Sequence, residues 1–450
     1  MLLRFQVSGF RSFIYPAELD LLSRALKTVV PRKGQSWIDC TERVAAIYGP
    51  NASGKTTILD AMHAVAYSIV NDGSGEIFQP HQAVDKANAV TAYSIDFVGP
   101  DGVRYLYEIE ARTWGIARES LHSFPRSSKR TLFVRQQSAQ GEAIQFSKGA
   151  SLTGPTVEVL KLTKAHMLYL AVARKYGHVS LSPIADALAL GSSVEQVSFR
   201  DAEDIDVIRR VIGEMLAAPG EQGKLVQALL KVADLGLEEI DIQSEAIPEE
   251  VVQKFARVAE VLSSKQLSEI EAEIPRIRDK IVFIHSGEGG SRFELPLRAQ
   301  SSGTLTWLTI AWHTLNALKR GSILLVDELD ASLHPELARY IVSLFTSDHL
   351  NPHGAQLVFS THDVSLLGNA PTRILYPRNI WFVQKDDSGY SELYSLDDFD
   401  DRPRNNSEKR YLAGRFGAVP QLDDFLLYDF ITTPSFRKLG REGQVDDDGK

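Results

Sequence analysis

A glycine-rich stretch near the start of the chain has the residue types and spacing of a phosphate-binding loop. In GPNASGKTT, Gly49, Gly54, Lys55 and Thr56 occupy the places that the P-loop pattern requires. Glycines let backbone amides turn toward phosphate oxygens, and a helix that follows adds the positive end of its dipole. The lysine reaches the outer phosphates, and the threonine hydroxyl is a ligand for Mg²⁺. The predicted nucleotide-binding residues here are Asn51, Ser53, Gly54, Lys55, Thr56 and Thr57.

Two adjacent acids end an apolar stretch much later in the chain. The run ILLVDELD predicts a buried strand that brings Asp327 and Glu328 to one end of a sheet. Asp327 would reach the water shell of a metal ion, and Glu328 would polarise the water that attacks a terminal phosphate. Thr56 and Asp327 are therefore predicted Mg²⁺ ligands, and Glu328 is a predicted catalytic residue. The two motifs together predict ATP and Mg²⁺ as cofactors and leave the class of ATPase open.

Two short runs after the acidic strand distinguish between classes of ATPase. LDASLHPE, residues 329 to 336, resembles the D-loop of ABC-type ATPases, and FSTHD resembles the strand end that carries their switch histidine. The resemblance implies a nucleotide-binding role for Asp330 and a catalytic role for His362. A histidine at a strand end can contact the terminal phosphate and report its presence. His334 is more typical of a D-loop framework residue than of a catalytic base.

The stretch LRAQSSGTLTWLTIAW opens an apolar, helix-like run with a polar cluster. One interpretation is local: Ser301 or Ser302 caps a helix that begins near Gly303, which contributes roughly 1 kcal/mol. The other is that QSSGT is similar to the ABC signature motif, with Ser301 and Gly303 in the matching places, although it departs from the common transporter form. That resemblance implies a hydroxyl and a helix N-terminus that close over the nucleotide held by a second subunit.

Two further assignments come from single residues near the P-loop. Arg11, in GFRSF, matches a basic residue that approaches the nucleotide in ATPases of this type, and a surface arginine after a strand is the alternative interpretation. Gln79, in IFQPHQ, is the predicted metal-binding glutamine of the Q-loop, and Gln82 is the second candidate. The remaining alternative is that neither glutamine binds magnesium.

A parallel sheet has to position these groups. RVAAIYGP predicts a strand that ends in the P-loop, GKTTILDAMHAVAYSIV predicts the helix after it, and SILLVDE and QLVFSTHD predict two further strands separated by the helix PELARYIVSLF. Alternating runs between about 89 and 146 predict an antiparallel sheet with a hairpin turn at GPDG. From about 156 to 278 the pattern becomes helical. The fold predicted is an α/β P-loop NTPase with an antiparallel β subdomain and an inserted helical lobe.

Length and composition are those of an ordinary globular protein. The chain has 450 residues, 44% of them hydrophobic and 24% charged, which is enough for several structural units. The predicted units are residues 1–150, the N-terminal half of the ATPase head; 151–280, the helical lobe; 281–400, the C-terminal half of the head; and 401–450, an extension with an acidic tail. The composition of that tail predicts disorder.

Charge and cysteine content restrict the partners that we expect. A net charge of -9 gives no global electrostatic case for nucleic-acid binding. Cys40 is alone, so no internal disulfide can form, and the first residues lack the features of a signal peptide. No apolar run approaches the roughly 20 residues of a membrane helix. We expect a cytoplasmic protein without a membrane partner.

The order of the motifs resembles one branch of the ABC ATPases. The chain contains, in this order, a P-loop, a long insertion, SSGT, VDELDASLHP and STHD. This order resembles that of the SMC-like branch, which includes RecF, Rad50 and the overcoming-lysogenization-defect proteins. The runs LLRFQVSGFRSF, NIWFVQKDDSGYSELYSLDDF and KRYLAGRFGAVP look like stand-alone ATPases of bacterial phage-defence and abortive-infection operons, such as the RloA/AbiLi type, the PARIS ATPase AriA and, more distantly, PtuA.

This resemblance implies an ABC-type (SMC/Rad50-like) head and an ATP-sandwich homodimer, or a higher even-numbered homo-oligomer. It also implies a separately encoded effector of Toprim or HNH nuclease type, and a phage-derived trigger.

The first functional hypothesis is an ATP-driven sensor and switch in phage defence. The alternative is a RecF-like DNA repair or maintenance ATPase that binds DNA directly, and the acidity of the chain and the missing coiled coil weigh against it. A transporter subunit fits poorly because of the long insertion, and a ring-forming AAA+ motor lacks the serine-glycine signature and the switch histidine. A self-contained nuclease is disfavoured because the residues after His362 lack the spaced acids that would bind two metals.

Overall fold

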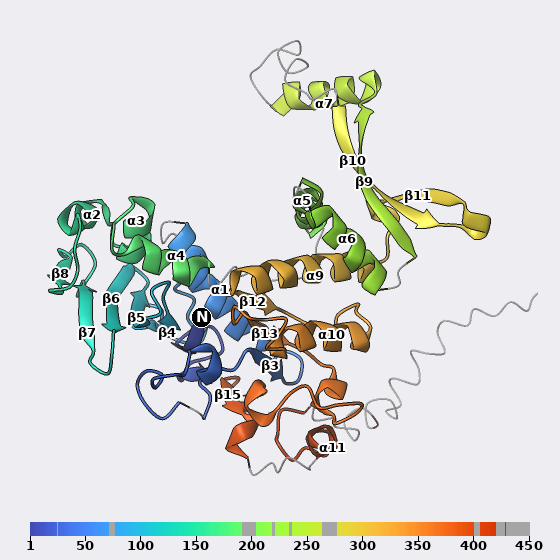
Figure 1. Ribbon diagram of the computed structural model, residues 1–450. Helices are drawn as coiled ribbons and strands as arrows, with labels where there is room; N and C mark the ends of the chain where they lie inside the picture. Colours follow the sequence, from blue (N-terminus) through green and yellow to red (C-terminus); the bar gives the residue numbers. More distant parts are fainter. Residues whose placement is uncertain are drawn as a thin grey trace, which may run out of the picture.

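The computed structural model describes residues 1–24, 26–71, 77–190, 204–217, 221–233, 236–262, 277–399, 406–419 and 428. Figure 1 shows a layered body from which one strand-and-helix element projects. Within these ranges, no helix is both long enough and apolar enough to cross a membrane. The acidic tail for which the sequence predicts disorder lies outside the described residues.

A five-stranded sheet forms the centre of the body. Its strands lie in the order β12 (Ile323–Val326), β13 (Gln356–Ser360), β3 (Val44–Tyr48), β14 (Ile380–Lys385) and β15 (Ser391–Ser395). The first four strands are parallel, and β15 returns antiparallel to β14. The strands predicted to carry the P-loop, the acidic pair and the switch histidine are thus neighbours, and their carboxyl ends meet at one edge. The predicted α/β P-loop fold is confirmed.

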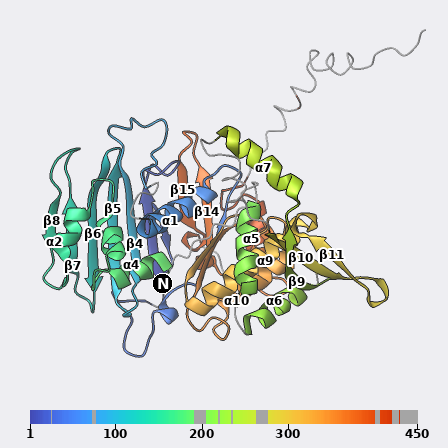
Figure 2. The same ribbon diagram turned by 90° about the horizontal axis from the view of Figure 1, so that it is seen from above.

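The central strand β3 contributes to two hydrophobic cores. Ala45 and Ile47 face the core that contains α1 (Lys55–Val70) and the antiparallel sheet. Ala46 and Tyr48 face the core that contains α9 (Ser302–Arg320) and α10 (Pro335–Thr346). Because side chains of a strand alternate between its faces, β3 joins the two cores. Figure 2 shows α9 and α10 on the side of the body away from the antiparallel sheet.

The antiparallel sheet predicted between about residues 89 and 146 is present, and two N-terminal strands extend it to seven strands in the described part of the chain. Their order is β2 (Ala17–Asp20), β1 (Leu2–Ser8), β4 (Thr91–Val98), β5 (Arg104–Arg112), β6 (Gly115–Phe124), β7 (Arg130–Gln136) and β8 (Gln145–Lys148). The predicted GPDG turn joins β4 to β5, with Gly102 at a positive φ of 73°. The N-terminal strand β1 is therefore part of this sheet.

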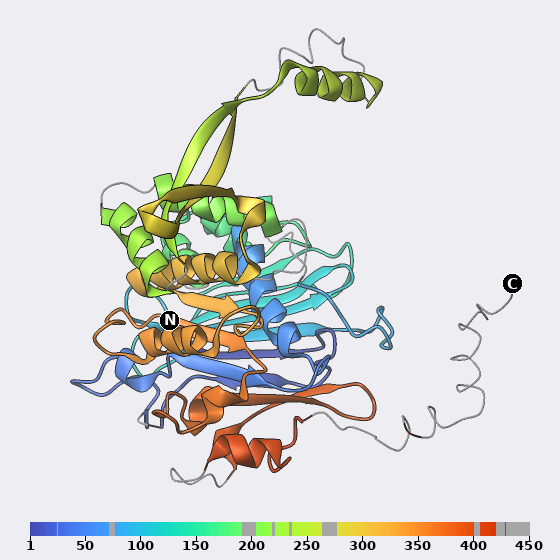
Figure 3. The same cartoon turned by 90° about the vertical axis from the view of Figure 1, so that its right-hand side faces the viewer.

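Several helices and a smaller sheet follow in the chain. The helices are α2 (Thr156–Leu162), α3 (Tyr169–Lys175), α4 (Ser182–Leu190), α5 (Asp204–Ala217), α6 (Glu221–Val232) and α7 (Glu249–Leu262), and a short helix, α11 (Ser407–Leu412), comes near the end. The strands are β9 (Leu237–Ala246), β10 (Ile277–Ser286) and β11 (Arg292–Pro296), in the order β11-β10-β9. Figures 1 and 3 show β9, β10 and α7 projecting from the body.

Strand β9 lies within the segment for which the sequence pattern predicts helices only. It pairs with β10 from Leu237 to Ala246, and most of its side chains are exposed or half-buried. The pairing partner lies in a distant part of the sequence, so no local periodicity marks β9 as a strand. Tertiary pairing overrides local propensity here.

A buried ion pair fixes the connection between α2 and α3 to the antiparallel sheet. Glu119 and Arg135 are fully buried, with 3.6 Å between carboxylate and guanidinium. The carboxylate accepts hydrogen bonds from the hydroxyl of Tyr107 (2.8 Å) and from the backbone N–H groups of Tyr169 (2.6 Å) and Leu170 (2.9 Å). The guanidinium donates to carbonyl oxygens of residues 164, 165 and 167. Burial raises the pKa of Glu119, and the charge of Arg135 opposes that shift.

We predict that Arg135→Met lowers the free energy of unfolding by about 3–5 kcal/mol, because it leaves a buried carboxylate without its cation. Urea denaturation of the two proteins measures the difference. Arg130→Met, an exposed change on the same strand, is the matched control and should stay within about 0.5 kcal/mol of the wild type. A loss in Arg135→Met no larger than that of the control would contradict this account of the pair.

Candidate nucleotide-binding site

The predicted phosphate loop connects β3 to α1. The loop turns through two residues in the left-handed region, Ala52 with φ 59° and Gly54 with φ 114°. Lys55 is buried, and its ammonium donates to the carbonyl oxygens of Gly49 (3.0 Å) and Pro50 (3.2 Å). The lysine head group is therefore held over its own loop, at the N-terminus of a 16-residue helix, where the helix dipole favours an anion.

Close neighbours explain why two positions of the loop require glycine. A Cβ on Gly49 would lie 2.3 Å from the carbonyl oxygen of Val383 in β14. A Cβ on Gly54 would lie 2.6 Å from the hydroxyl of Ser391, on a backbone with positive φ. Any other residue at either position would displace the loop from the strands β14 and β15.

Hydrogen bonds join the acidic strand end to the P-loop and to β13. The hydroxyl of Thr56 donates to one carboxylate oxygen of Asp327 (2.8 Å), and the hydroxyl of Ser360 donates to the other. The Ser360 oxygen also accepts the backbone N–H of Glu328 (2.7 Å). Glu328 has a positive φ of 53°, a strained conformation that non-glycine residues adopt mainly at functional sites. Ser360 thus holds both acids in place.

Thr56 and Asp327, two of the predicted metal ligands, lie in direct contact and offer oxygen donors, which Mg²⁺ prefers. In the described part of the chain, no group of three or more His, Cys, Asp or Glu side chains is placed to hold a metal ion. This donor set fits Mg²⁺, which usually takes one or two protein ligands and completes its shell with phosphates and water.

The predicted switch histidine lies beside the loop that follows the acidic pair. One oxygen of Asp330 accepts from the hydroxyl of Thr361 (2.6 Å) and from the backbone N–H of His362 (3.1 Å). Burial, together with the positive charge of Lys55, lowers the pKa of His362 below its ordinary value, and three nearby carboxylates oppose the shift. The lowered pKa favours the neutral form of the imidazole, and the effect of Lys55 on this pKa indicates that the two side chains lie near each other.

Arg11 and Gln79 lie together at one side of the P-loop helix. The backbone N–H of Arg11 donates to the carbonyl oxygen of Gln79 (2.6 Å), and its Nε donates to the side-chain oxygen of Gln79 (2.8 Å). The guanidinium also forms an ion pair with Asp60 of α1. The second glutamine candidate, Gln82, is exposed. The structure thus connects Arg11, Gln79 and the helix that carries Lys55.

Residues from the last hairpin support the loop, and sequence reasoning missed them. The hydroxyl of Ser391 donates to the carbonyl oxygen of Ser53 (2.5 Å) and lies 2.8 Å from the hydroxyl of Ser12. Next to it, the ring of Tyr390 packs edge-on against Tyr15 (6.1 Å) and His81 (5.5 Å). No sequence motif predicts the role of these side chains, because they contact the P-loop region only when the fold places β15 beside it.

The polar cluster before α9 is a helix cap, and the structure selects Ser301 over Ser302. The hydroxyl of Ser301 accepts the backbone N–H of Thr304 (3.1 Å), and α9 begins at Ser302. A Cβ on Gly303 would lie 2.8 Å from the carbonyl oxygen of Ser332, in the loop after Asp330. Ser301 and Gly303 therefore lie beside the predicted D-loop, whereas Lys55, Thr56, Asp327, Glu328 and His362 form a separate cluster at the carboxyl ends of the strands.

We predict that Ser360→Ala lowers the rate of ATP hydrolysis about 10-fold or more, since it removes a charge-assisted hydrogen bond to Asp327 and the partner of the Glu328 N–H. A coupled phosphate-release assay gives kcat and KM, and KM for ATP should change little. Ser388→Ala, in the exposed turn between β14 and β15, is the control. Unchanged kcat in Ser360→Ala would show that the two acids keep their positions without this serine.

Comparisons with known proteins found similar solved structures and one matching family. Among solved structures, the chain is similar to the recombination mediator protein RecF-ATP in the RecFOR pathway, with 13% identity, 87% of this chain and 97% of that chain covered, and a TM-score of 0.35. The chain is also similar to the RecF-ATPrS structure of the same pathway, with 12% identity, 87% of this chain and 98% of that chain covered, and a TM-score of 0.32. No curated protein matches the sequence. Residues 44–368, most of the chain, match the family described as "AAA domain, putative AbiEii toxin, Type IV TA system". The chain belongs to this family of P-loop ATPases.

Proposed function

We propose that this chain is an ATP-driven switch of a bacterial anti-phage or abortive-infection system. Two copies close over ATP, hydrolysis allows them to reopen, and the change holds or releases a separately encoded effector. The observation that carries the proposal is the chain of hydrogen bonds from Thr56 to Asp327, Ser360 and Glu328, because it brings a phosphate loop and a pair of acids into one site.

Each residue of the site has a role that follows from its contacts. Lys55 and the amides of the loop bind the outer phosphates, and Thr56 with Asp327 would hold Mg²⁺, which would neutralise phosphate charge. Glu328, fixed by Ser360, orients and polarises the attacking water. The imidazole of His362 can donate an N–H hydrogen bond to the terminal phosphate.

The other half of the site comes from a second copy. The hydroxyl of Ser301 and the first amides of α9, a 19-residue helix, form a site suited to phosphate. Gly303 lies against the loop that contains Asp330, and Asp330 in turn binds the backbone of His362. A nucleotide held between two copies would therefore contact the start of α9 in one copy. Through the D-loop of that same copy, this contact would affect the position of its His362.

The family supports the biological role. Its description names a putative AbiEii toxin and a type IV TA system. The runs LLRFQVSGFRSF, NIWFVQKDDSGYSELYSLDDF and KRYLAGRFGAVP look like stand-alone ATPases of phage-defence operons. The proposed partner is an effector of Toprim or HNH nuclease type, and a phage-derived molecule is the proposed trigger. The net charge of -9 favours this role over direct DNA binding.

Mixing two inactive variants tests the sandwich arrangement. Lys55→Ala disables the P-loop half of a site, and Ser301→Arg disables the signature half, so each variant alone should lose ATP hydrolysis. In a mixed dimer both changes fall in one site and the other site is intact. With random pairing half of the dimers are mixed, so the mixture should recover about a quarter of the wild-type rate. If both variants are folded and their mixture stays inactive, the site does not form between two copies.

Expression in a host tests the biological role. Cells that carry the chain with its neighbouring genes should give about tenfold or more fewer plaques, and Lys55→Ala should abolish this protection because nucleotide binding drives the switch. Arg320→Ala, an exposed change at the end of α9, should leave protection intact. Full protection by Lys55→Ala would contradict an ATP-driven switch. Tight DNA binding by the purified chain, stimulated by ATP and weakened by salt, would favour the DNA-repair alternative.

A further inference from the structure

A second pocket lies at the base of the projecting sheet, outside the nucleotide site described above. Its volume is about 530 Å³, and its walls come from α5, β9, β10 and the short 3₁₀ helix η3 (Leu297–Ala299) that precedes Ser301. Three of the lining residues are cationic: Arg209, Lys280 and Arg298. Three others are branched apolar residues: Ile242, Ile281 and Leu297.

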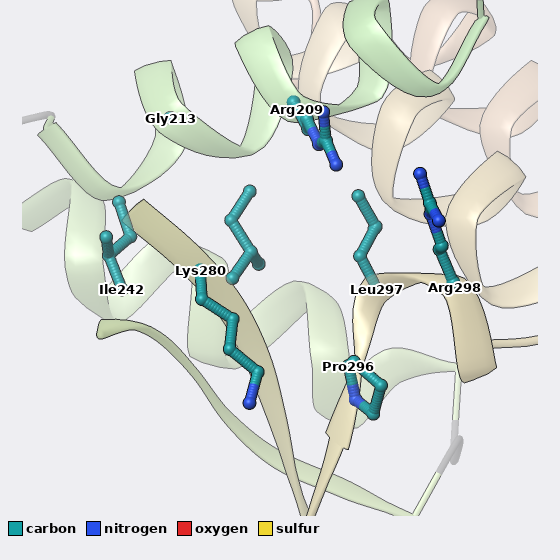
Figure 4. Close-up of a pocket in the computed structure, with 8 residues that line it drawn as sticks. Arg209, Gly213, Ile242, Lys280, Pro296, Leu297 and Arg298 are labelled. Atoms are coloured by element: carbon teal, nitrogen blue, oxygen red, sulfur yellow. The ribbon is translucent and has the colours of Figure 1, made fainter. Parts of the chain in front are cut away.

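The cations of this pocket are arranged at its two ends. Figure 4 shows the side chains of Arg209 on α5 and Arg298 on η3 directed into the same space, with Leu297 beside them. Lys280 lies at the other end on β10, with its ammonium pointing away from the two arginines. None of the described residues that line the pocket is acidic. In a chain with a net charge of -9, such a grouping creates a local field that attracts anions. Two guanidinium groups suit phosphate, which they bind through paired N–H donors.

The apolar wall restricts the kind of anion. Small-ligand pockets have volumes of roughly 300–1,000 Å³ and combine apolar walls with a few polar groups that orient the ligand. A bare phosphate would fill only a small part of this volume and would leave the exposed Ile242 and the half-buried Ile281 facing water. We propose that this pocket binds a small molecule that carries both phosphate and a flat ring, of the size of a mononucleotide, and that it is separate from the ATP site.

The position of the pocket links it to the signature helix. Arg298 lies in η3, three residues before Ser301. In the same segment, the side-chain oxygen of Gln300 lies 3.2 Å from Nε2 of His285 in β10. A ligand that bridges α5, β10 and η3 therefore fixes the segment from which α9 starts, and the coupling is reciprocal. This regulatory step rests on the proposed role of Ser301 in ATP hydrolysis, whereas binding to the pocket does not.

The binding test uses the full chain with Lys55→Ala, so that the P-loop does not contribute, and AMP and inorganic phosphate as probes in isothermal titration calorimetry. AMP should bind saturably, and more tightly than inorganic phosphate because its base contacts the apolar wall. Adding Arg298→Ala or Lys280→Ala should weaken AMP binding about 10-fold each, the loss expected for one charge-assisted contact. Adding Arg298→Lys should weaken it less, and adding Arg320→Ala, outside the pocket, should leave it unchanged.

Three outcomes would overturn the pocket as a nucleotide site. In the first, Lys55→Ala shows no saturable AMP binding. In the second, the affinity of Lys55→Ala for AMP is the same with and without Arg298→Ala. In the third, a short single-stranded oligonucleotide binds more tightly than AMP does. The last result would assign the cations to a nucleic acid.

The coupling to ATP hydrolysis has its own test. AMP should change the hydrolysis rate of the wild-type protein, and the part of that change that comes from the pocket should disappear in Arg298→Ala. One pair of results would overturn the coupling to Ser301 and support the pocket alone. In that case Lys55→Ala binds AMP, but AMP changes the hydrolysis rate equally in the wild type and in Arg298→Ala.

Discussion

Asp327 accepts hydrogen bonds from the side chains of Thr56, at the start of α1, and Ser360, at the end of β13. The P-loop connects Thr56 to the end of β3, Ser360 is the last residue of β13, and Asp327 directly follows the last residue of β12. A carboxylate bound from both sides keeps three strand ends in register at one edge. The glycine loop, the strained backbone of Glu328 and the position of His362 all depend on that edge, since each is attached to one of the three strands.

The two hydrophobic cores supply the rigidity that this arrangement needs. Because β3 contributes alternate side chains to both cores, movement of the P-loop relative to the acids would disturb packing on both faces of the sheet. The elements that project from the body, by contrast, have mostly exposed side chains along β9. A rigid strand edge and a projecting sheet are the two parts that the proposed switch would require, one to bind the nucleotide and one to respond to it.

The sequence alone predicts the parts of the site that lie within short motifs. The P-loop, the acidic pair, the serine cap of α9 and three strands of the central sheet, β3, β12 and β13, could be predicted because local spacing and alternation carry their signal. The support of the loop by Ser391, the contact of Arg11 with Asp60 and the strand β9 could not, because each depends on pairing between residues far apart in the chain. Gln79 shows the limit of sequence-based prediction. The sequence indicates it as a candidate for the Q-loop glutamine, but only the fold shows that its side chain lies against Arg11.

The hydrogen bond between Ser391 and the carbonyl of Ser53 spans 338 positions of the chain. During synthesis the ribosome releases the phosphate loop early, whereas the strands that flank β3 follow about three hundred residues later. Such non-local contacts make folding slow. The nucleotide site is therefore completed only after β15 has been synthesised. A chain that ended before β13 would contain every residue of the P-loop and still lack both strands that flank β3, so the residues of the motif would be present without the sheet that positions them.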